Sequence, residues 1–174
     1  YNPLFDAGYL IARMLPPDAS ITVNGELSDW SCVPFVHLGV DSSAYVVPPG
    51  GPSSSDGDFA MRWTPQTIYF AARVQSDYSG NNATISWQND SAELYISGAS
   101  SPGVYFTAND HHYIVDYKNL AKDYFGPNSG ERPSLTGFTS AVQKVDGGFV
   151  LEMSVSAGAL GIGTLGGNVL GFDV

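Results

Sequence analysis

A tryptophan in a polar stretch and the acidic and histidine side chains near it are the residues best suited to contact a ligand. Trp87 precedes the segment 90–98 in a polar loop, where a buried tryptophan would be unusual. The flat indole face can stack on the apolar C–H face of a sugar ring, while Glu, His or Asn side chains hydrogen-bond its hydroxyls. This combination favours carbohydrate binding. By contrast, Trp63 lies inside an expected strand and Trp30 closes a turn, so we expect both in the core.

Oxygen-bearing side chains gather at the ends of the expected strands. They are Asp56, Asp58, Asp77, Asn81, Asn82, Asn89, Asp90, Asn109 and Asp110. Calcium takes about six to eight oxygen ligands, including the carbonyls that irregular loops supply. Asp is also a common turn former, but the set predicts one structural calcium. The adjacent histidines His111 and His112 cannot bind one ion together, because neighbours in a strand point to opposite faces.

Composition excludes several classes of partner. The chain has 174 residues and a formal net charge of −10, from 7 basic and 17 acidic side chains. A field of that sign repels phosphate backbones and anionic lipid, which argues against nucleic acid and membrane insertion. Cys32 is the single cysteine, so no internal disulfide can form. No nucleotide loop, metalloprotease motif or nucleophile elbow is present, and we expect no enzyme. Few Lys and many Ser, Thr, Asn, Gly and Tyr favour an extracellular location.

The elements that would position these residues are short strands separated by turn signals. The expected strands are 32–40, 59–64, 67–74, 90–98, 111–117, 138–145, 149–156 and 169–174. Within 90–98, alternation places Glu93 on the face opposite Leu94. The segment 21–30 also alternates before a turn at Asn24-Gly25, and 118–135 reads as a long loop with a helical turn at 120–124. No helical pattern reaches twelve residues, which predicts one all-β sandwich domain over 21–174.

The first twenty residues stand apart from that domain. A short apolar stretch ends at Pro16-Pro17, so residues 1–20 are predicted to be an N-terminal strap or linker arm. Because two prolines hold an arm away from its own domain, this segment is also suited to pack on a neighbouring molecule.

Several stretches, taken in order, resemble carbohydrate-binding modules of family 9, a group within the DOMON-like clan. The matching stretches are VNGELSDW (23–30), FAMRWTPQTIYFAARVQSD (59–77), WQNDSAELYIS (87–97), HHYIVDY (111–117), GGFVLEMSVSAGALG (147–161) and NVLGFDV (168–174). Together they cover roughly residues 20–174. The hairpin and the WQNDSAELY stretch are the most specific of these.

The resemblance implies a jelly-roll-like antiparallel β-sandwich, structural calcium and binding of sugar-chain ends between two tryptophans. The sugar-contacting positions of the family are matched here by Trp87, Glu93, His112 and Asp116. The calcium-ligand position after the hairpin is matched by Asp77, which with Asn89 and Asp90 makes up the expected metal site.

Two departures from the family pattern bear on function. Ile114 stands where sugar-binding members can carry a basic residue, and the chain ends at Val174 where members continue with strands that carry the second tryptophan. We therefore expect the sandwich to be completed by residues after Val174, by the apolar arm of residues 1–15, or by strand addition between copies.

The resulting hypothesis is a non-catalytic, secreted or cell-surface module that binds a polysaccharide or glycan by stacking a sugar on Trp87. The alternative is a structural module of an extracellular assembly or fibre in which the sugar site has been lost. A third hypothesis comes from the wider clan, whose haem b domains use Met and His axial ligands. In this chain Met61 and either His111 or His112 would take those roles.

Overall fold

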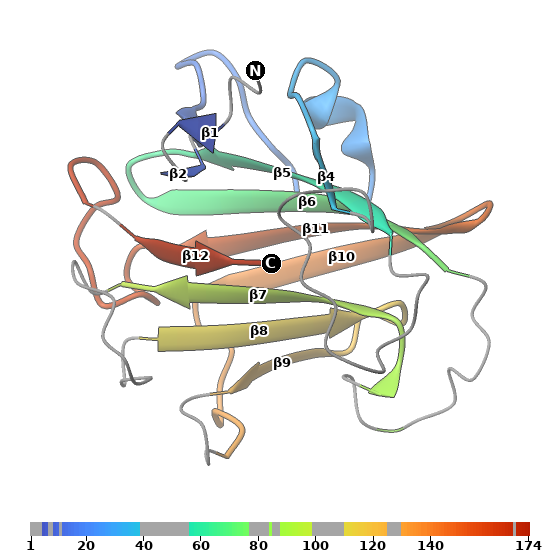
Figure 1. The fold of residues 1–174 in the computed structure, drawn as a ribbon. Coiled ribbons are helices and arrows are strands. Elements are labelled where there is room, and N and C mark those ends of the chain that lie inside the picture. Colours follow the sequence, from blue (N-terminus) through green and yellow to red (C-terminus); the bar gives the residue numbers. More distant parts are fainter. Residues whose placement is uncertain are drawn as a thin grey trace.

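The computed structural model is a sandwich of two β-sheets (Figure 1). It describes residues 12–38, 56–76, 88–98, 110–124, 130–168 and 170–174, with Thr84 and the two short strands β1 (Phe5–Asp6) and β2 (Tyr9–Leu10). The predicted all-β sandwich is confirmed, because the described residues contain no α-helix and one short 3₁₀ helix, η1 (Leu27–Trp30).

The larger sheet, called here the long sheet, has the order β10-β11-β6-β5-β3, with β4 also pairing with β5. Its strands are β3 (Arg13–Met14), β4 (Val36–Leu38), β5 (Gly57–Trp63), β6 (Thr67–Gln75), β10 (Phe138–Val145) and β11 (Gly148–Ser156). Neighbours pair antiparallel except β3, which runs parallel to β5. The predicted hairpin of β10 and β11 is confirmed, and Gly147 in its turn has a φ of 74°, a conformation that favours glycine.

The smaller sheet, called here the short sheet, has the order β12-β7-β8-β9 and is antiparallel throughout. Its strands are β7 (Ser91–Ser97), β8 (Asp110–Asp116), β9 (Ala121–Tyr124) and β12 (Gly171–Asp173). Among the described residues, β12 pairs with β7 on one side and with no strand on the other. By contrast, β11 is paired on both sides, with β10 and β6.

The main core lies between the two sheets. Strict alternation sends every second side chain inward, so β11 contributes Phe149, Leu151, Met153 and Val155, all essentially unexposed. The short sheet contributes Leu94, Ile96, Tyr113 and Val115 to the same core. Phe59 of β5 meets Phe172 of β12 with ring centroids 5.8 Å apart, which ties the end of the chain to the long sheet.

A second, smaller cluster covers the outer face of the long sheet. It is formed by Leu15, Ile21, Trp30, Ala60 and Ala71. Leu15 donates its backbone N–H to the Trp63 carbonyl at 2.8 Å, and the Trp63 indole donates to the Ala12 carbonyl at 3.0 Å. The end of the predicted strap therefore packs on its own domain.

Glu152 fastens this second cluster to the sheet. Its side chain is fully buried on the outer face of β11. One carboxylate oxygen accepts from the backbone N–H groups of Asn24 and Gly25 at 2.9 and 2.8 Å, and the other accepts from the Trp30 indole at 2.8 Å. The stretch VNGELSDW is thereby held against a strand about 120 residues later in the chain.

One local prediction is wrong. Residues 121–124 form the strand β9 instead of a helical turn, because Asn119 adopts a φ of 61° and turns the chain back beside β8. The chain bends at Asn24-Gly25 as expected, with Gly25 at a φ of 84°, and η1 follows that bend.

Candidate functional site

The pairing of β7 with β8 brings two of the predicted sugar-binding residues together. The register sets Glu93 opposite Ile114 and Tyr95 opposite His112. Directly opposed residues share one face of a sheet, and this is the face turned away from Leu94 and the main core. The predicted orientation of Glu93 is thus confirmed.

Glu93, Tyr95 and His112 form a compact polar group on that outer face. His112 Nε2 lies 2.8 Å from Glu93 Oε2, and the Tyr95 hydroxyl donates to the same oxygen at 3.2 Å. The Tyr95 and His112 rings stack with centroids 3.9 Å apart. The hydrogen bond from His112 lowers the pKa of Glu93 below its usual value, although partial burial opposes that shift. Glu93 is therefore an ionised acceptor at neutral pH.

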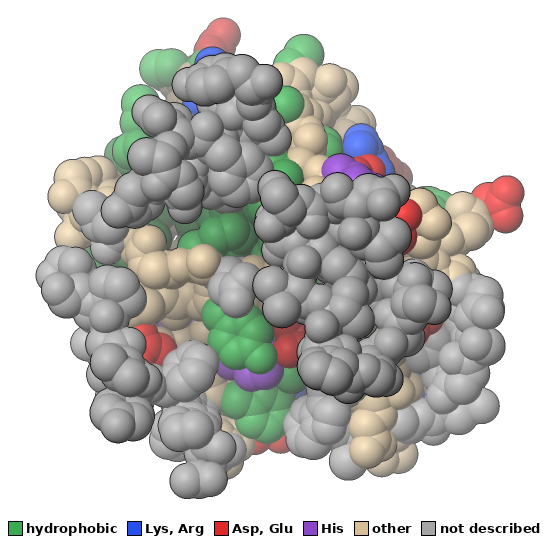
Figure 2. Space-filling view, viewed as in Figure 1, with side chains coloured by type: hydrophobic (Ala, Val, Ile, Leu, Met, Phe, Trp, Pro, Cys, Tyr) green, Lys and Arg blue, Asp and Glu red, His purple; other side chains and the backbone are tan. Residues whose placement is uncertain are grey.

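Strand β9 extends this group across a third strand. Tyr124 pairs with His112, and their ring centroids are 6.0 Å apart. Lys122, opposite Ile114, lies 2.6 Å from Glu131 in an ion pair that solvent reaches. On the corresponding face, Figure 2 shows histidine surface between hydrophobic side chains with acidic surface beside it. Sequence analysis missed Tyr124, because the segment that carries it was read as part of a loop.

Asp116 lies on the same strand but has no exposed surface. Its Oδ1 accepts from the backbone N–H groups of Lys118 and Leu120, both at 2.9 Å, and its Oδ2 accepts from the Asn89 side chain at 2.9 Å. The carboxylate therefore organises the turn from β8 into β9. In this arrangement Asp116 positions the strands and is not available to touch a ligand.

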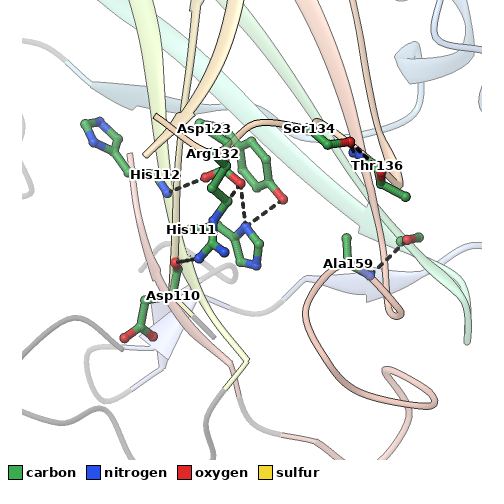
Figure 3. A network of polar contacts seen from close by, with 10 residues as sticks. Asp110, His111, His112, Asp123, Arg132, Ser134, Thr136 and Ala159 are labelled. Atoms are coloured by element: carbon green, nitrogen blue, oxygen red, sulfur yellow. Dashed lines mark hydrogen bonds and ion pairs between the residues drawn. The ribbon is translucent and has the colours of Figure 1, made fainter. Parts of the chain in front are cut away.

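A buried ionic network supports His112 from the core side (Figure 3). Asp123 of β9 accepts from His111 Nδ1 at 2.8 Å and from the backbone N–H of His112 at 3.3 Å. Arg132 Nε lies 3.1 Å from the same carboxylate, and its Nη2 donates to the Asp110 carbonyl at 2.8 Å. The network fixes β8 against β9 at the residue that faces Glu93. No sequence signal pointed to Asp123 or Arg132.

The ring nitrogen of His111 is held inside this network. The Tyr113 hydroxyl lies 3.0 Å from His111 Nδ1, and the two rings stack at 5.2 Å. Burial and the nearby Asp123 carboxylate raise the pKa of Tyr113. Met61, the other residue of the haem hypothesis, is a partly buried side chain of β5 packed on the main core.

The predicted calcium ligands are described only in part. Asp90 accepts a hydrogen bond from the Ser76 hydroxyl, which joins the end of β6 to the start of β7. Asn89 is buried beside Asp116, and Asp77 lies outside the described residues. Hard oxygen donors at residues 76 and 90 suit calcium in kind. Within the described ranges, however, no three His, Cys, Asp or Glu side chains are arranged to hold a metal ion, so calcium stays a prediction.

Trp87, the predicted stacking residue, also lies outside the described residues. In the sequence it stands four positions before the first residue of β7, the strand that carries Glu93 and Tyr95. Among the residues that the structure does describe, no helix is long and apolar enough to cross a membrane.

Comparison with known proteins identifies a family. Residues 42–174 match the model of a family described as carbohydrate family 9 binding domain-like. An exoglucanase of Acetivibrio thermocellus is 25% identical over 123 residues, which are 69% of this chain and 11% of that protein. An endo-1,4-beta-xylanase A of Thermotoga neapolitana is 25% identical over 93 residues, 53% of this chain and 8% of that protein. The chain thus spans about a tenth of the length of these relatives.

Solved structures share the fold. A family 9 carbohydrate-binding module from Caldicellulosiruptor kristjanssonii, in complex with cellotriose, superimposes with a TM-score of 0.68 and 17% identity, over 92% of this chain and 72% of that one. A putative carbohydrate-binding protein from Bacteroides uniformis gives a TM-score of 0.63 and 15% identity, over 92% of this chain and 79% of that one.

Proposed function

Because the chain belongs to the carbohydrate family 9 binding domain-like family, we propose that it is a non-catalytic module that binds a polysaccharide chain on the outer face of the short sheet. Glu93 and His112 accept and donate hydrogen bonds to sugar hydroxyls, and Trp87 stacks on a sugar ring at the edge of the same face. The module belongs to a secreted or cell-surface protein and localises it on the glycan.

The observation that carries this proposal is the contact of Glu93 with His112. An ionised carboxylate and an imidazole lie 2.8 Å apart, and the side chains are 36% and 20% exposed. They are flanked by the rings of Tyr95 and Tyr124. Sugar sites combine aromatic surface with a few oriented polar groups, because hydroxyls need directed partners and C–H faces need apolar contact.

The fold supports a rigid site. Glu93, Tyr95 and His112 stand on the paired strands β7 and β8, and the buried network around Asp123 fixes β8 against β9. Groups held by paired strands and by supporting hydrogen bonds lose little conformational freedom when a ligand binds.

The test is retention of the purified domain on insoluble cellulose, xylan and chitin, followed by calorimetric titration with soluble oligosaccharides. The wild type should bind at least one of them, and His112→Ala and Trp87→Ala should each lower the affinity by at least tenfold. Val145→Ala, an exposed position on β10 of the other sheet, is the control and should bind like the wild type. Folding of each variant is checked by circular dichroism. Failure of the wild type to bind any of these glycans would favour the structural-module alternative.

A further inference from the structure

The hydrogen-bonding roles of Glu93 and His112 follow from their contact. Because Glu93 is ionised, both of its oxygens act only as acceptors, so His112 Nε2 must carry the proton that lies between the two groups. The Tyr95 hydroxyl is used as a donor to the same carboxylate.

The Glu93 oxygen left for a ligand is therefore an acceptor. Glu93 Oε2 takes the two internal hydrogen bonds, so within the described part of the chain Glu93 Oε1 has no partner. A ligand must bring a donor to satisfy it. Hydroxyl and ammonium groups do so, whereas the carboxylate of an acidic sugar or a sulfate ester offers only further acceptors.

The charges around Glu93 favour an ammonium donor over a hydroxyl donor. Lys122, which shares the outer face of the short sheet with Glu93, is paired with Glu131 at 2.6 Å, and Arg132, on the core side, is paired with Asp123 at 3.1 Å. Among the described residues no Lys or Arg pairs with the Glu93 carboxylate, whose partners are His112 and the Tyr95 hydroxyl, and the chain carries a net charge of −10. A hydroxyl and an ammonium group both form charge-assisted hydrogen bonds with a carboxylate, but only the ammonium group adds the attraction between two opposite unit charges. An ammonium group therefore gains more at this position than a hydroxyl.

We propose that this surface prefers glycans with a free, protonated amino group, such as β-1,4-linked glucosamine, over the neutral glycans of the same backbone. The proposal rests on the proposed function, since it assigns the preferred ligand of that same site. Glu93 is the specificity-determining residue, because its carboxylate pairs with the ammonium group.

Three trimers with one backbone and one variable substituent provide the test. Cellotriose carries a hydroxyl at C2, the chitin trimer an acetamide and the chitosan trimer a free amine. Titrations are run at about pH 6, clearly below the range near pH 7.7–8.0 in which α-amino groups titrate, because the electron-withdrawing oxygens of a sugar ring make its amine less basic than those groups. Glu93, whose pKa is lowered, is still ionised there. We expect the chitosan trimer to bind about five- to tenfold more tightly than cellotriose, and we expect added salt to reduce that ratio.

Two variants assign the preference to one carboxylate. Glu93→Gln removes the charge and keeps the side-chain shape, so the preference should disappear. Asp146→Asn removes one charge in the exposed turn between β10 and β11, and it should leave the preference unchanged. Equal loss of preference in both variants would show attraction to overall charge and overturn the inference.

The remaining outcomes also decide the question. Cellotriose binding with no preference for the amine refutes the inference and leaves the proposed function standing. If none of the trimers binds, the proposed function fails and the inference fails with it. If Glu93→Gln binds no trimer, the test is the effect of salt on the wild type. A preference of the wild type for the amine that added salt does not reduce would overturn the assignment of that preference to the Glu93 charge.

Discussion

Replacing Glu152 with Gln tests how the N-terminal segment is held on the long sheet. The carboxylate receives three hydrogen bonds, two from the backbone at residues 24 and 25 and one from the Trp30 indole. A carboxamide has a single acceptor oxygen. If that oxygen faces the two backbone donors, the new NH₂ group opposes the indole N–H, and the reverse orientation leaves two backbone donors unsatisfied.

The expected cost follows from these three contacts. One hydrogen bond to a charged acceptor is lost, which costs about 1.5–3 kcal/mol. The other two become hydrogen bonds to a neutral acceptor, and this weakening costs about 0.5–1 kcal/mol each. The side chain is fully buried, so bulk water does not replace the lost contact. We expect Glu152→Gln to lower the free energy of unfolding by about 2.5–5 kcal/mol, measured by urea denaturation with circular dichroism.

A double-mutant cycle with Trp30→Phe isolates the mechanism. The phenylalanine ring has no donor, so the carboxamide NH₂ can take the position of the lost contact without facing another N–H group. Glu152→Gln should therefore cost about 1–2 kcal/mol less in the Trp30→Phe background than in the wild type. The same cost in both backgrounds, or a wild-type cost below about 0.5 kcal/mol, would refute the argument. Sugar affinity should change little, because Glu152 belongs to the other sheet.

Four further predictions concern the rest of the molecule. Trp63→Ala should lower the free energy of unfolding by about 2–4 kcal/mol in urea denaturation, because a partly buried indole bound to the Ala12 carbonyl is lost; an unchanged midpoint would contradict this role. If calcium is bound, excess chelator should lower the melting temperature and added calcium should restore it, whereas an unchanged melting curve would remove the calcium prediction. Because folding lowers the pKa of Glu93, its ionised side chain adds to the free energy of unfolding at pH values above its unfolded pKa of about 4.3, and this contribution is lost as the pH falls through the folded pKa. The pH dependence of the free energy of unfolding, measured by urea denaturation, should lack this component in Glu93→Gln. Asp123→Asn should lower the free energy of unfolding by about 3 kcal/mol and also weaken sugar binding, since it removes the charged partner that His111 and Arg132 share. Wild-type sugar affinity in a folded Asp123→Asn protein would argue against the positioning role of Asp123.

The sequence by itself determined the fold class and the direction in which the side chains of the β-strands point. Alternation with a period of two is a local property, so the outward orientation of Glu93 and the hairpin of residues 138–156 were read correctly before any pairing was known. The family was also within reach, because its motifs are short stretches that remain readable without tertiary contacts.

Only the tertiary structure decided which of these residues meet. Glu93 and His112 are 19 positions apart, and their contact depends on the register of β7 against β8, which alternation does not specify. Asp116 lies on the same face of β8 as His112, yet the turn after it and the Asn89 side chain use both of its oxygens. Glu152 meets Trp30 across 122 positions. Such contacts depend on how strands that are distant in sequence pack together, and local residue patterns do not specify that packing.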